Sequence, residues 1–201
     1  LTDPMVRYYQ GWCHTQAGDS DAAARSFAGA QAVPPDYCFP QRIEAVPALQ
    51  AALMADPADG RAAYYLGNFW YAHRRYDEAI TAWELAYRLD PAFPTVQRNL
   101  GLAAVNKRHD MAAALAYYER AFALDETDAR VYFELDQLRK KMGADPAARL
   151  AALEQHRALV DQRDDLTIEY IALLNLRGQV DAALHLLTTR TFHPWEGGEG
   201  K

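Results

Sequence analysis

The chain has 201 residues, of which 50% are hydrophobic and 24% are charged, and its formal net charge is −6. A chain of this size can bury a core, and its acidic balance excludes the basic surface typical of nucleic-acid-binding proteins. No stretch approaches the roughly 18 apolar residues of a membrane-spanning helix, so we expect neither nucleic acid nor membrane as a partner.

The only cysteines are Cys13 and Cys38, which excludes a disulfide framework and constrains the cellular compartment weakly. We expect both thiols to be packed and the location to be cytoplasmic. The chain begins with Leu1 rather than methionine, so we expect a piece of a longer protein, in which a missing signal peptide says little.

The first predicted unit spans about residues 4–37 and consists of two amphipathic helices. Gly11 lies in the first helix, and Ala23 and Phe27 lie in the second, at a spacing of small and large residues that returns further along the chain. Pro35 follows the second helix, because proline cannot continue a helix.

The second unit, at residues 38–59, is degenerate. The string EAVPALQAALMADP, from Glu44 to Pro57, matches only the second helix of a pair. Pro34, Pro35 and Pro40 leave little room for a regular first helix, since proline lacks an amide hydrogen and clashes with the preceding turn.

The third unit, at residues 60–93, is the clearest. The string HRR at residues 73–75 breaks the apolar spacing between its two helices, and Pro91 stops the second helix. Small and large side chains recur in both helices at Leu66, Gly67, Trp70, Ala79, Trp83 and Ala86.

The fourth unit, at residues 94–128, repeats this pattern. Leu100-Gly101 follows Leu66-Gly67 after 34 residues, and Ala114 and Tyr118 continue the order of the second helix. One extra residue separates the two helices, and we place it in the turn.

The fifth unit, at residues 129–163, continues the series with Tyr132 and Leu135, but Asp136 stands where glycine is expected. In the sixth, at residues 164–191, Asp164 and Asp165 suit a helix start, where carboxylates favour the positive end of the helix dipole. The last apolar helix is predicted from Val180 to about Thr189.

We expect residues 192–201 to be a capping segment and linker stub. Pro194 is expected to stop any helix, Phe192 and Trp195 are suited to cover the last hairpin, and the string GGEG is expected to be a permissive connector. A contact strip for a neighbouring domain and a catalytic role are the alternatives.

Steric fit explains the alternating residue sizes. Small residues let the two helices of a hairpin approach closely, and large ones fill the gaps between successive hairpins. One hairpin cannot bury its apolar face alone, so neighbours must stack. No strand is evident, and we predict an all-α fold.

The spacing of Leu66-Gly67, Trp70, Ala79, Trp83, Ala86 and Pro91 resembles the tetratricopeptide repeat (TPR). This resemblance implies a right-handed superhelix, or solenoid, of stacked antiparallel helix pairs. The strings YCFPQRIEAV, YYLGN, RNLG, ELDQL and TFHPWEGGEGK are also similar to the C-terminal part of large bacterial proteins that carry an uncharacterised galactose-mutarotase-like β-rich domain.

The concave face of such a superhelix is lined by the first helix of each pair and is the expected binding surface. Aromatic side chains there supply contact area, asparagines bond to an extended backbone, and arginines recognise carboxylates. The alternative is that the tyrosines pad the helix stack and the arginines are solvated. The residues predicted to line the groove are Tyr64, Tyr65, Asn68, Tyr71, Arg98, Asn99 and Arg130.

Some tetratricopeptide proteins grip a C-terminal carboxylate with asparagines and basic residues. Asn68 and Asn99 match the two asparagine positions of that pattern, and Arg130 matches one basic position. Tyr64 and Glu134 stand where further cations are needed, so the predicted clamp is incomplete.

No motif in the sequence indicates catalysis. The six histidines have no partner at a metal-ligand spacing, apart from His193 and Glu196 near the end of the chain. We therefore expect no enzyme in this chain, no metal and no cofactor.

The predicted function is a non-catalytic scaffold that binds a protein segment or another domain of the same parent chain. Two alternatives remain: an accessory helical domain that shapes or supports the sugar site of a carbohydrate-active bacterial parent protein, and self-association through the last hairpin.

Overall fold

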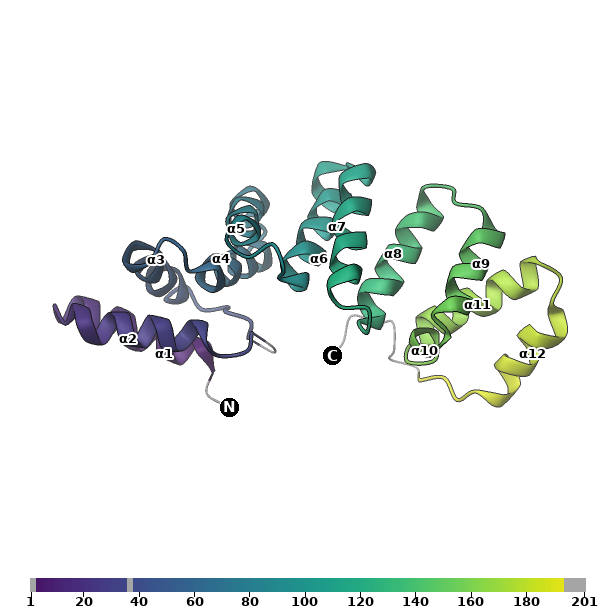
Figure 1. Cartoon of the computed structure of the whole chain (residues 1–201), viewed down its shortest axis with the longest axis horizontal. Helices are drawn as coiled ribbons and strands as arrows, with labels where there is room; N and C mark the ends of the chain where they lie inside the picture. Colours follow the sequence, from purple (N-terminus) through teal and green to yellow (C-terminus); the bar gives the residue numbers. More distant parts are fainter. Residues whose placement is uncertain (1–2, 36–37, 194–201) are drawn as a thin grey trace. The chain divides into compact units, whose positions relative to one another are not determined.

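A computed structural model describes residues 3–35 and 38–193 of the chain. All regular secondary structure within these ranges is helical, which confirms the predicted all-α fold. The helices are arranged in packed pairs (Figure 1). Two compact units divide the chain, residues 1–108 and residues 109–201, and each is described separately.

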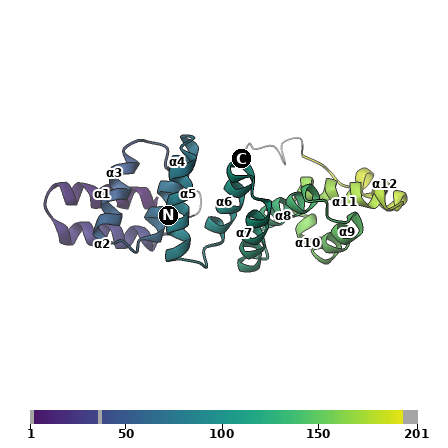
Figure 2. The same ribbon diagram turned by 90° about the horizontal axis from the view of Figure 1, so that it is seen from above.

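The first unit begins with a hairpin in which the first two helices lie side by side (Figure 2). A single third helix packs against the first helix and the fourth, which forms the next hairpin with the fifth. A shorter sixth helix runs directly into a π-helical segment. The elements are α1 (Pro4–Gln16), α2 (Ser20–Gln31), α3 (Ala45–Ala55), α4 (Gly60–Ala72), α5 (Tyr76–Leu89), α6 (Pro94–Ala103) and η1 (Ala104–Arg108).

The second unit contains two helix pairs, a preceding helix and one short helical turn. Its core joins apolar side chains of α8 to those of α9, α11 and α12. The elements are α7 (Met111–Leu124), α8 (Ala129–Lys141), α9 (Pro146–Gln155), α10 (Arg157–Val160), α11 (Asp164–Leu176) and α12 (Val180–Thr189).

Aspartate begins most of the longer helices. The carboxylate of the N-cap residue accepts a backbone N–H of the first turn, which satisfies a donor that has no partner inside the helix. Asp59 caps α4 in this way and is fully buried, and the hydroxyl of Tyr8 donates to both of its oxygens at 3.1 Å. The cap therefore also ties α1 to the start of α4.

Glycine permits the close helix contacts that the sequence pattern predicted. A Cβ atom on Gly67 would lie 2.2 Å from Cδ1 of Trp83, and one on Gly11 would lie 2.3 Å from Cε1 of Phe27. Both aromatic side chains are buried. The small residue of one helix thus leaves room for the large residue of the next.

In the fifth repeat, at residues 129–163, Asp136 makes a different contact between the two helices. Its carboxylate pairs with the guanidinium of Arg149 on α9, Oδ1 with Nε at 2.9 Å and Oδ2 with Nη2 at 2.5 Å. Both side chains are at most 6% exposed. A buried bidentate ion pair therefore joins the two helices where glycine is expected.

The extra residue of the fourth repeat, at residues 94–128, lies in a helix, not in the turn. A residue with positive φ lies in the turn after the first helix of a pair. In three pairs this residue comes seven positions after Gly11, Gly67 or Asp136. In the fourth repeat, the residue with positive φ is His109, which comes eight positions after Gly101. The π-helical segment η1 takes up the difference, since a π-helix is an α-helix widened by an inserted residue. The predicted placement in the turn is therefore wrong.

The degenerate unit supplies only one helix, as predicted. The described residues between α2 and α3 form no helix, and α3 lies within the predicted Glu44–Pro57 segment. At the other end of the chain, α12 has the predicted bounds, and Asp164 and Asp165 lie in the first turn of α11.

The segment after α12 turns back onto the start of α11. Arg190 donates from Nη2 to Oδ1 of the buried Asp164 at 2.8 Å, and the backbone N–H of His193 donates to Oδ2 at 2.5 Å. Phe192 packs against the core of the second unit. Trp195, the other predicted capping residue, lies outside the described residues.

Candidate protein-binding site

The predicted groove residues of the first unit lie on α4 and α6. Asn68, Tyr71 and Arg98 are half-buried. Tyr64 and Tyr65 are only 4% and 0% exposed, and Asn99 is 8% exposed, contrary to the expectation that these positions face solvent. Neighbouring parts of the first unit cover them.

The two tyrosines of α4 fill space inside the first unit. The ring of Tyr64 lies 4.8 Å from that of Phe93, which precedes α6, and the ring of Tyr65 lies 5.9 Å from that of Tyr8 on α1. Tyr71 also packs on other rings, at 5.2 Å from Trp83 and 5.1 Å from Tyr76. For these tyrosines the structure agrees with the alternative of padding.

The asparagines of α4 and α6 are joined by hydrogen bonds. Nδ2 of Asn99 donates to Oδ1 of Asn68 at 3.2 Å, and Nε1 of Trp83 donates to the same oxygen at 3.1 Å. Nη1 of Arg98 donates to Oδ1 of Asn99 at 3.3 Å. The chain of bonds fixes both amides and connects two successive first helices.

Two guanidinium groups stand near the hydroxyl of Tyr64. Burial raises its pKa, while a hydrogen bond with Asn68 and the charges of Arg98 and Arg61 oppose that rise. The guanidinium of Arg61 lies 3.8 Å from the centre of the Phe93 ring. Its Nη1 atom is buried and has no hydrogen-bond partner within the part of the chain that the structure describes.

We call Arg61, Asn68, Arg98 and Asn99 the polar row. Its members come from α4 and α6 and are held by aromatic packing and hydrogen bonds. Arg61 is one of the concave-face positions that the sequence indicates, although it is not among the seven predicted groove residues. Its position in the first turn of a first helix is a sequence signal for it, but only the packing on Phe93 shows how deeply its guanidinium is placed.

Arg130 belongs to the second unit, where it lies in the first turn of α8. Its Nε donates to Oε1 of Glu134 at 3.3 Å, one turn further along the same helix. The structure does not relate Arg130 to the polar row, because the two lie in different units. The carboxylate clamp, which needs Arg130 together with Asn68 and Asn99, remains a prediction.

The cysteines differ in their surroundings. Cys38 is buried, and burial together with the charge of Asp3 raises the pKa of its thiol to about 12. Cys13 is exposed, so the expectation that it is packed is wrong.

The described residues contain no group of three His, Cys, Asp or Glu side chains placed to hold a metal ion. Glu196, the possible partner of His193, lies outside them. None of the helices described is both long enough and apolar enough to span a bilayer.

Residues 44–95, which include α3, α4 and α5, match the family model for the tetratricopeptide repeat. This segment is similar to the tetratricopeptide repeat. Repeats of this family generally act as scaffolds that bind proteins or peptides.

Solved structures extend the likeness beyond that segment. MamA has a TM-score of 0.58 at 19% identity, with 92% of this chain and 88% of that chain covered. PilF of Pseudomonas aeruginosa has a TM-score of 0.56 at 21% identity, covering 92% and 90%. YrrB, described as a TPR protein with an unusual peptide-binding site, has a TM-score of 0.58 at 23% identity, covering 86% of both chains. These likenesses show that the chain has the tetratricopeptide fold.

Proposed function

We propose that this chain is a non-catalytic scaffold whose polar row binds an extended acidic segment of another protein, or of a neighbouring domain of its own parent chain. The family match supports protein binding in general. YrrB, which shares the fold, is described as having a peptide-binding site. The choice of surface and ligand chemistry comes from the polar row itself.

The observation that carries the proposal is the guanidinium of Arg61. A buried donor without an acceptor is costly, and a ligand oxygen placed there would remove that cost. Arg98 lies on α6 and bonds to Asn99, and its charge and that of Arg61 both act to lower the pKa of Tyr64, which supports two cations meeting one acidic segment. Carboxylates are the acceptors that guanidinium groups bind best.

A binding experiment with short acidic peptides tests this role. Twelve-residue peptides rich in Asp and Glu are selected from a random library on the intact chain, and their affinities are measured by fluorescence anisotropy. Arg98→Glu should weaken the selected peptides by about ten-fold, because it reverses one of the two charges that face the ligand.

Arg25→Glu is the matched control. Arg25 lies exposed on α2, so this variant has the same net charge as Arg98→Glu without touching the polar row. It should change affinity by less than about two-fold, as expected for a remote surface charge. Equal affinities for all three proteins would remove the polar row from the binding site.

The role as an accessory domain for a sugar site has less support. It rests on the resemblance of short strings, whereas the family match and the similar structures are all to tetratricopeptide proteins or their fold. If the role is correct, saccharides bind the longer protein but not these 201 residues. Isothermal titration of both proteins distinguishes the outcomes.

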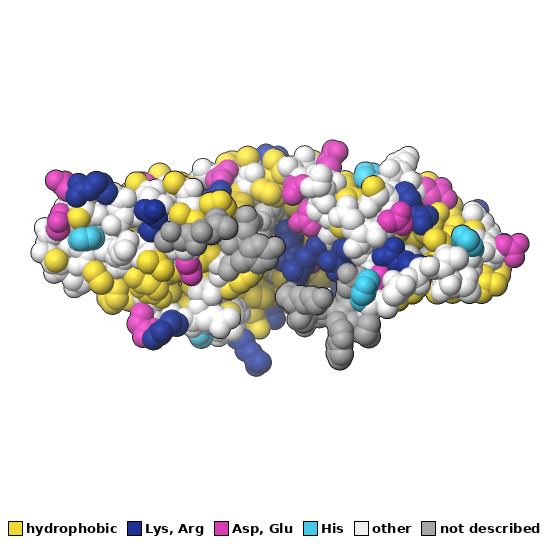
Figure 3. Space-filling view, turned by 90° about the horizontal axis from the view of Figure 1, so that it is seen from below, with side chains coloured by type: hydrophobic (Ala, Val, Ile, Leu, Met, Phe, Trp, Pro, Cys, Tyr) yellow, Lys and Arg dark blue, Asp and Glu magenta, His cyan; other side chains and the backbone are white. Residues whose placement is uncertain are grey.

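Self-association through α12 is a second candidate that one observation favours. Val180, Leu184 and Leu187 lie on one face of this helix and are 54%, 57% and 52% exposed. Hydrophobic side chains are also visible at the end of the second unit formed by α12 (Figure 3). A second copy of α12 could cover this face in a symmetric pair.

Sedimentation velocity at several concentrations tests the symmetric pair. The intact chain should show an average mass that rises with concentration, and Leu184→Glu with Leu187→Glu should abolish the rise, because charges would be placed in the interface. A mass that stays monomeric at every concentration excludes self-association.

A further inference from the structure

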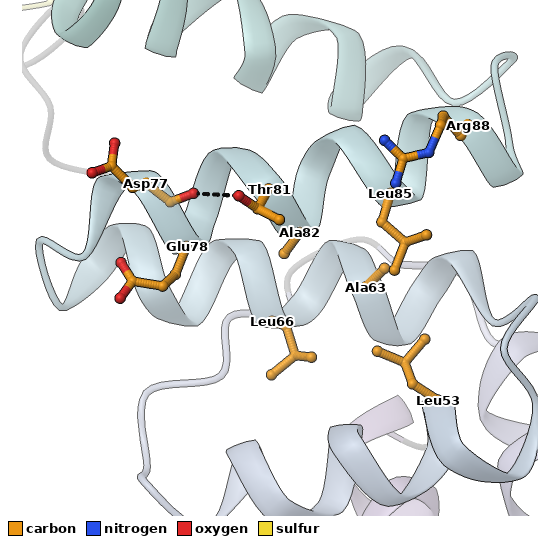
Figure 4. A pocket seen from close by; sticks show the side chains of 9 residues that line it. All are labelled: Leu53, Ala63, Leu66, Asp77, Glu78, Thr81, Ala82, Leu85 and Arg88. Atoms are coloured by element: carbon orange, nitrogen blue, oxygen red, sulfur yellow. Dashed lines mark hydrogen bonds between the residues drawn. The ribbon is translucent and has the colours of Figure 1, made fainter.

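An open groove of about 520 Å³ lies on the first unit between α3 and α5, and no residue of the polar row lines it (Figure 4). We call it the α3–α5 groove. Ala63 and Leu66 of α4 line it together with Leu53 of α3 and Leu85 of α5. Its middle part is therefore apolar and belongs to three different helices.

The degenerate repeat at residues 38–59 explains why this groove exists. The repeat that contains α3 has no first helix, so α3 packs instead against α1 and α4 of the neighbouring repeats. Leu53 is left facing α5 across the groove (Figure 4). The next residue of α3, Met54, is 85% exposed but does not line the groove.

Charged side chains occupy the two ends of the groove. Asp77 and Glu78 lie in the first turn of α5, where Glu78 is also paired with the guanidinium of Arg75, and Arg88 lies in its last turn. Asp77 and Arg88 are 11 residues apart, which corresponds to about 16 Å along a helix. A small-molecule site usually brings its few polar groups together on one ligand, whereas these groups are separated by three turns of helix.

The charge pattern selects one kind of occupant. A helix lying antiparallel to α5 would place its C-terminal end beside Asp77 and Glu78 and its N-terminal end beside Arg88. Basic residues are favourable at a helix C-terminus and acidic residues at an N-terminus, so the same sequence suits both its own dipole and the groove. An apolar stripe along it would cover Leu53, Leu66 and Leu85.

We propose that the α3–α5 groove is a second protein-binding surface, which takes an amphipathic helix with an acidic start and a basic end, antiparallel to α5. This surface is distinct from the polar row and does not depend on it. The apolar stripe supplies the affinity, and the end charges set the direction of the bound helix.

Two stapled 14-residue peptides test the direction. Both carry the same apolar stripe, one with Glu at its start and Lys at its end and the other with these charges exchanged; circular dichroism establishes equal helicity. The first should bind the intact chain about ten-fold tighter, because its two ends are attracted and those of the other are repelled. No binding of the first peptide, or equal binding of both, overturns the proposal.

A blocking variant tests the place. Thr81 is exposed in the groove, and its hydroxyl donates to the carbonyl of Asp77 one turn earlier. Thr81→Arg should fill the groove and weaken the peptide by at least about ten-fold without disturbing the core. Thr188→Arg is the matched control, since Thr188 is exposed on α12 and bonds in the same way to Leu184.

The control variant should bind the peptide like the unchanged chain. If Thr81→Arg binds equally well, the α3–α5 groove is not the site. Arg98→Glu should leave this peptide unaffected and weaken only the acidic peptides, so failure of either binding surface is recognised independently of the other.

Discussion

At Gly67, the α4–α5 hairpin leaves no room for a side chain. A Cβ atom would lie 2.2 Å from the buried ring of Trp83, whose indole also donates a hydrogen bond to Asn68. The ring cannot move without breaking that bond. Gly67→Ala should therefore lower the free energy of unfolding by about 1–3 kcal/mol through overpacking.

Urea denaturation measures this cost, and Gly29→Ala serves as its control. A Cβ on Gly29 would meet only the end of the Arg7 side chain, which can move. Alanine is about 1 kcal/mol better than glycine within a helix, so this variant should be neutral or stabilising. Similar losses at both positions would show that steric contact with Trp83 is not the cause.

Arg74 is strained in a different way. It has φ of 60° in the turn after α4, at the position where Gly18 has φ of 77° in the first hairpin. The left-handed conformation is unfavourable for a residue with a Cβ. Arg74→Gly should raise the free energy of unfolding by about 0.5–1 kcal/mol, after the entropic cost of glycine is subtracted.

Ala17→Gly provides the comparison for Arg74→Gly. Ala17 is the C-cap residue just before Gly18 and has φ of −81°, so glycine gains nothing there and should cost up to about 1 kcal/mol. Thermal unfolding of both variants measures the two effects. Destabilisation by Arg74→Gly would refute the argument from strain.

At the scale of helices, the pair of Asp136 and Arg149 connects α8 to α9 inside the second unit. Arg149 also donates to Glu169 of α11 at 3.0 Å. Asp136→Ala leaves the buried Arg149 with Glu169 as its ionic partner, so in urea denaturation the variant should cost less than the about 3–5 kcal/mol expected when a buried charge keeps no partner. The double variant Asp136→Ala with Arg149→Leu should recover most of this loss, since neither charge remains. No recovery would mean that the pair itself supplies net stability.

Glu169 makes part of the stability of α11 dependent on pH. Burial acts to raise its pKa, but hydrogen bonds from Lys140 and Arg149 outweigh burial and hold the pKa below its usual value. The unfolded chain therefore binds more protons at this group. Its contribution is present above the unfolded pKa of about 4.3 and is lost as pH falls through the lower folded pKa.

Glu169→Gln should reduce the loss of stability on acidification. Glutamine keeps an acceptor for Lys140 and Arg149 but does not titrate. Urea denaturation between pH 6 and pH 3 should give a smaller slope of unfolding free energy against pH for the variant. An unchanged slope would assign the acid sensitivity to other carboxylates.

Most helix positions could be predicted from the sequence, because their signals are local. Pro91 follows the end of α5, and the apolar residues of α12 recur at helical spacing. The exposure of Tyr64 and Tyr65 could not be predicted, since Phe93 and Tyr8, which pack against them, come from other elements. The ion pair of Asp136 was visible only as a missing glycine, because its partner is chosen by tertiary packing.

At the scale of the whole molecule, the chain is divided into two compact units. In repeat proteins each element is stabilised mainly by its neighbours, so damage should remain local. Asp136→Ala should therefore increase hydrogen exchange in α8, α9 and α11 while α1 and α2 keep their protection. Mass spectrometry of peptic fragments measures this, and uniform loss of protection would indicate one cooperative unit.

The two proposed binding surfaces also belong to this scale. The polar row is formed by α4 and α6, the first helices of two successive repeats. The α3–α5 groove arises where a repeat lacks its first helix. Positions on the first helices of the regular repeats could be named from the sequence because they are equivalent from one repeat to the next; that they bind a ligand stays a prediction. The α3–α5 groove could not be predicted, because it depends on how neighbouring helices pack around an incomplete repeat.

The π-helical segment η1 shows how a repeat can accommodate a change in its length. This part of the chain holds one residue more than the corresponding parts of the other repeats, and the wider hydrogen-bonded turn of the π-helix accommodates it while the following helix keeps its order of side chains. An array built this way tolerates single-residue changes of length inside a helix as well as in its loops, and its periodicity survives as spacing between contacts and not as a fixed count of amino acids.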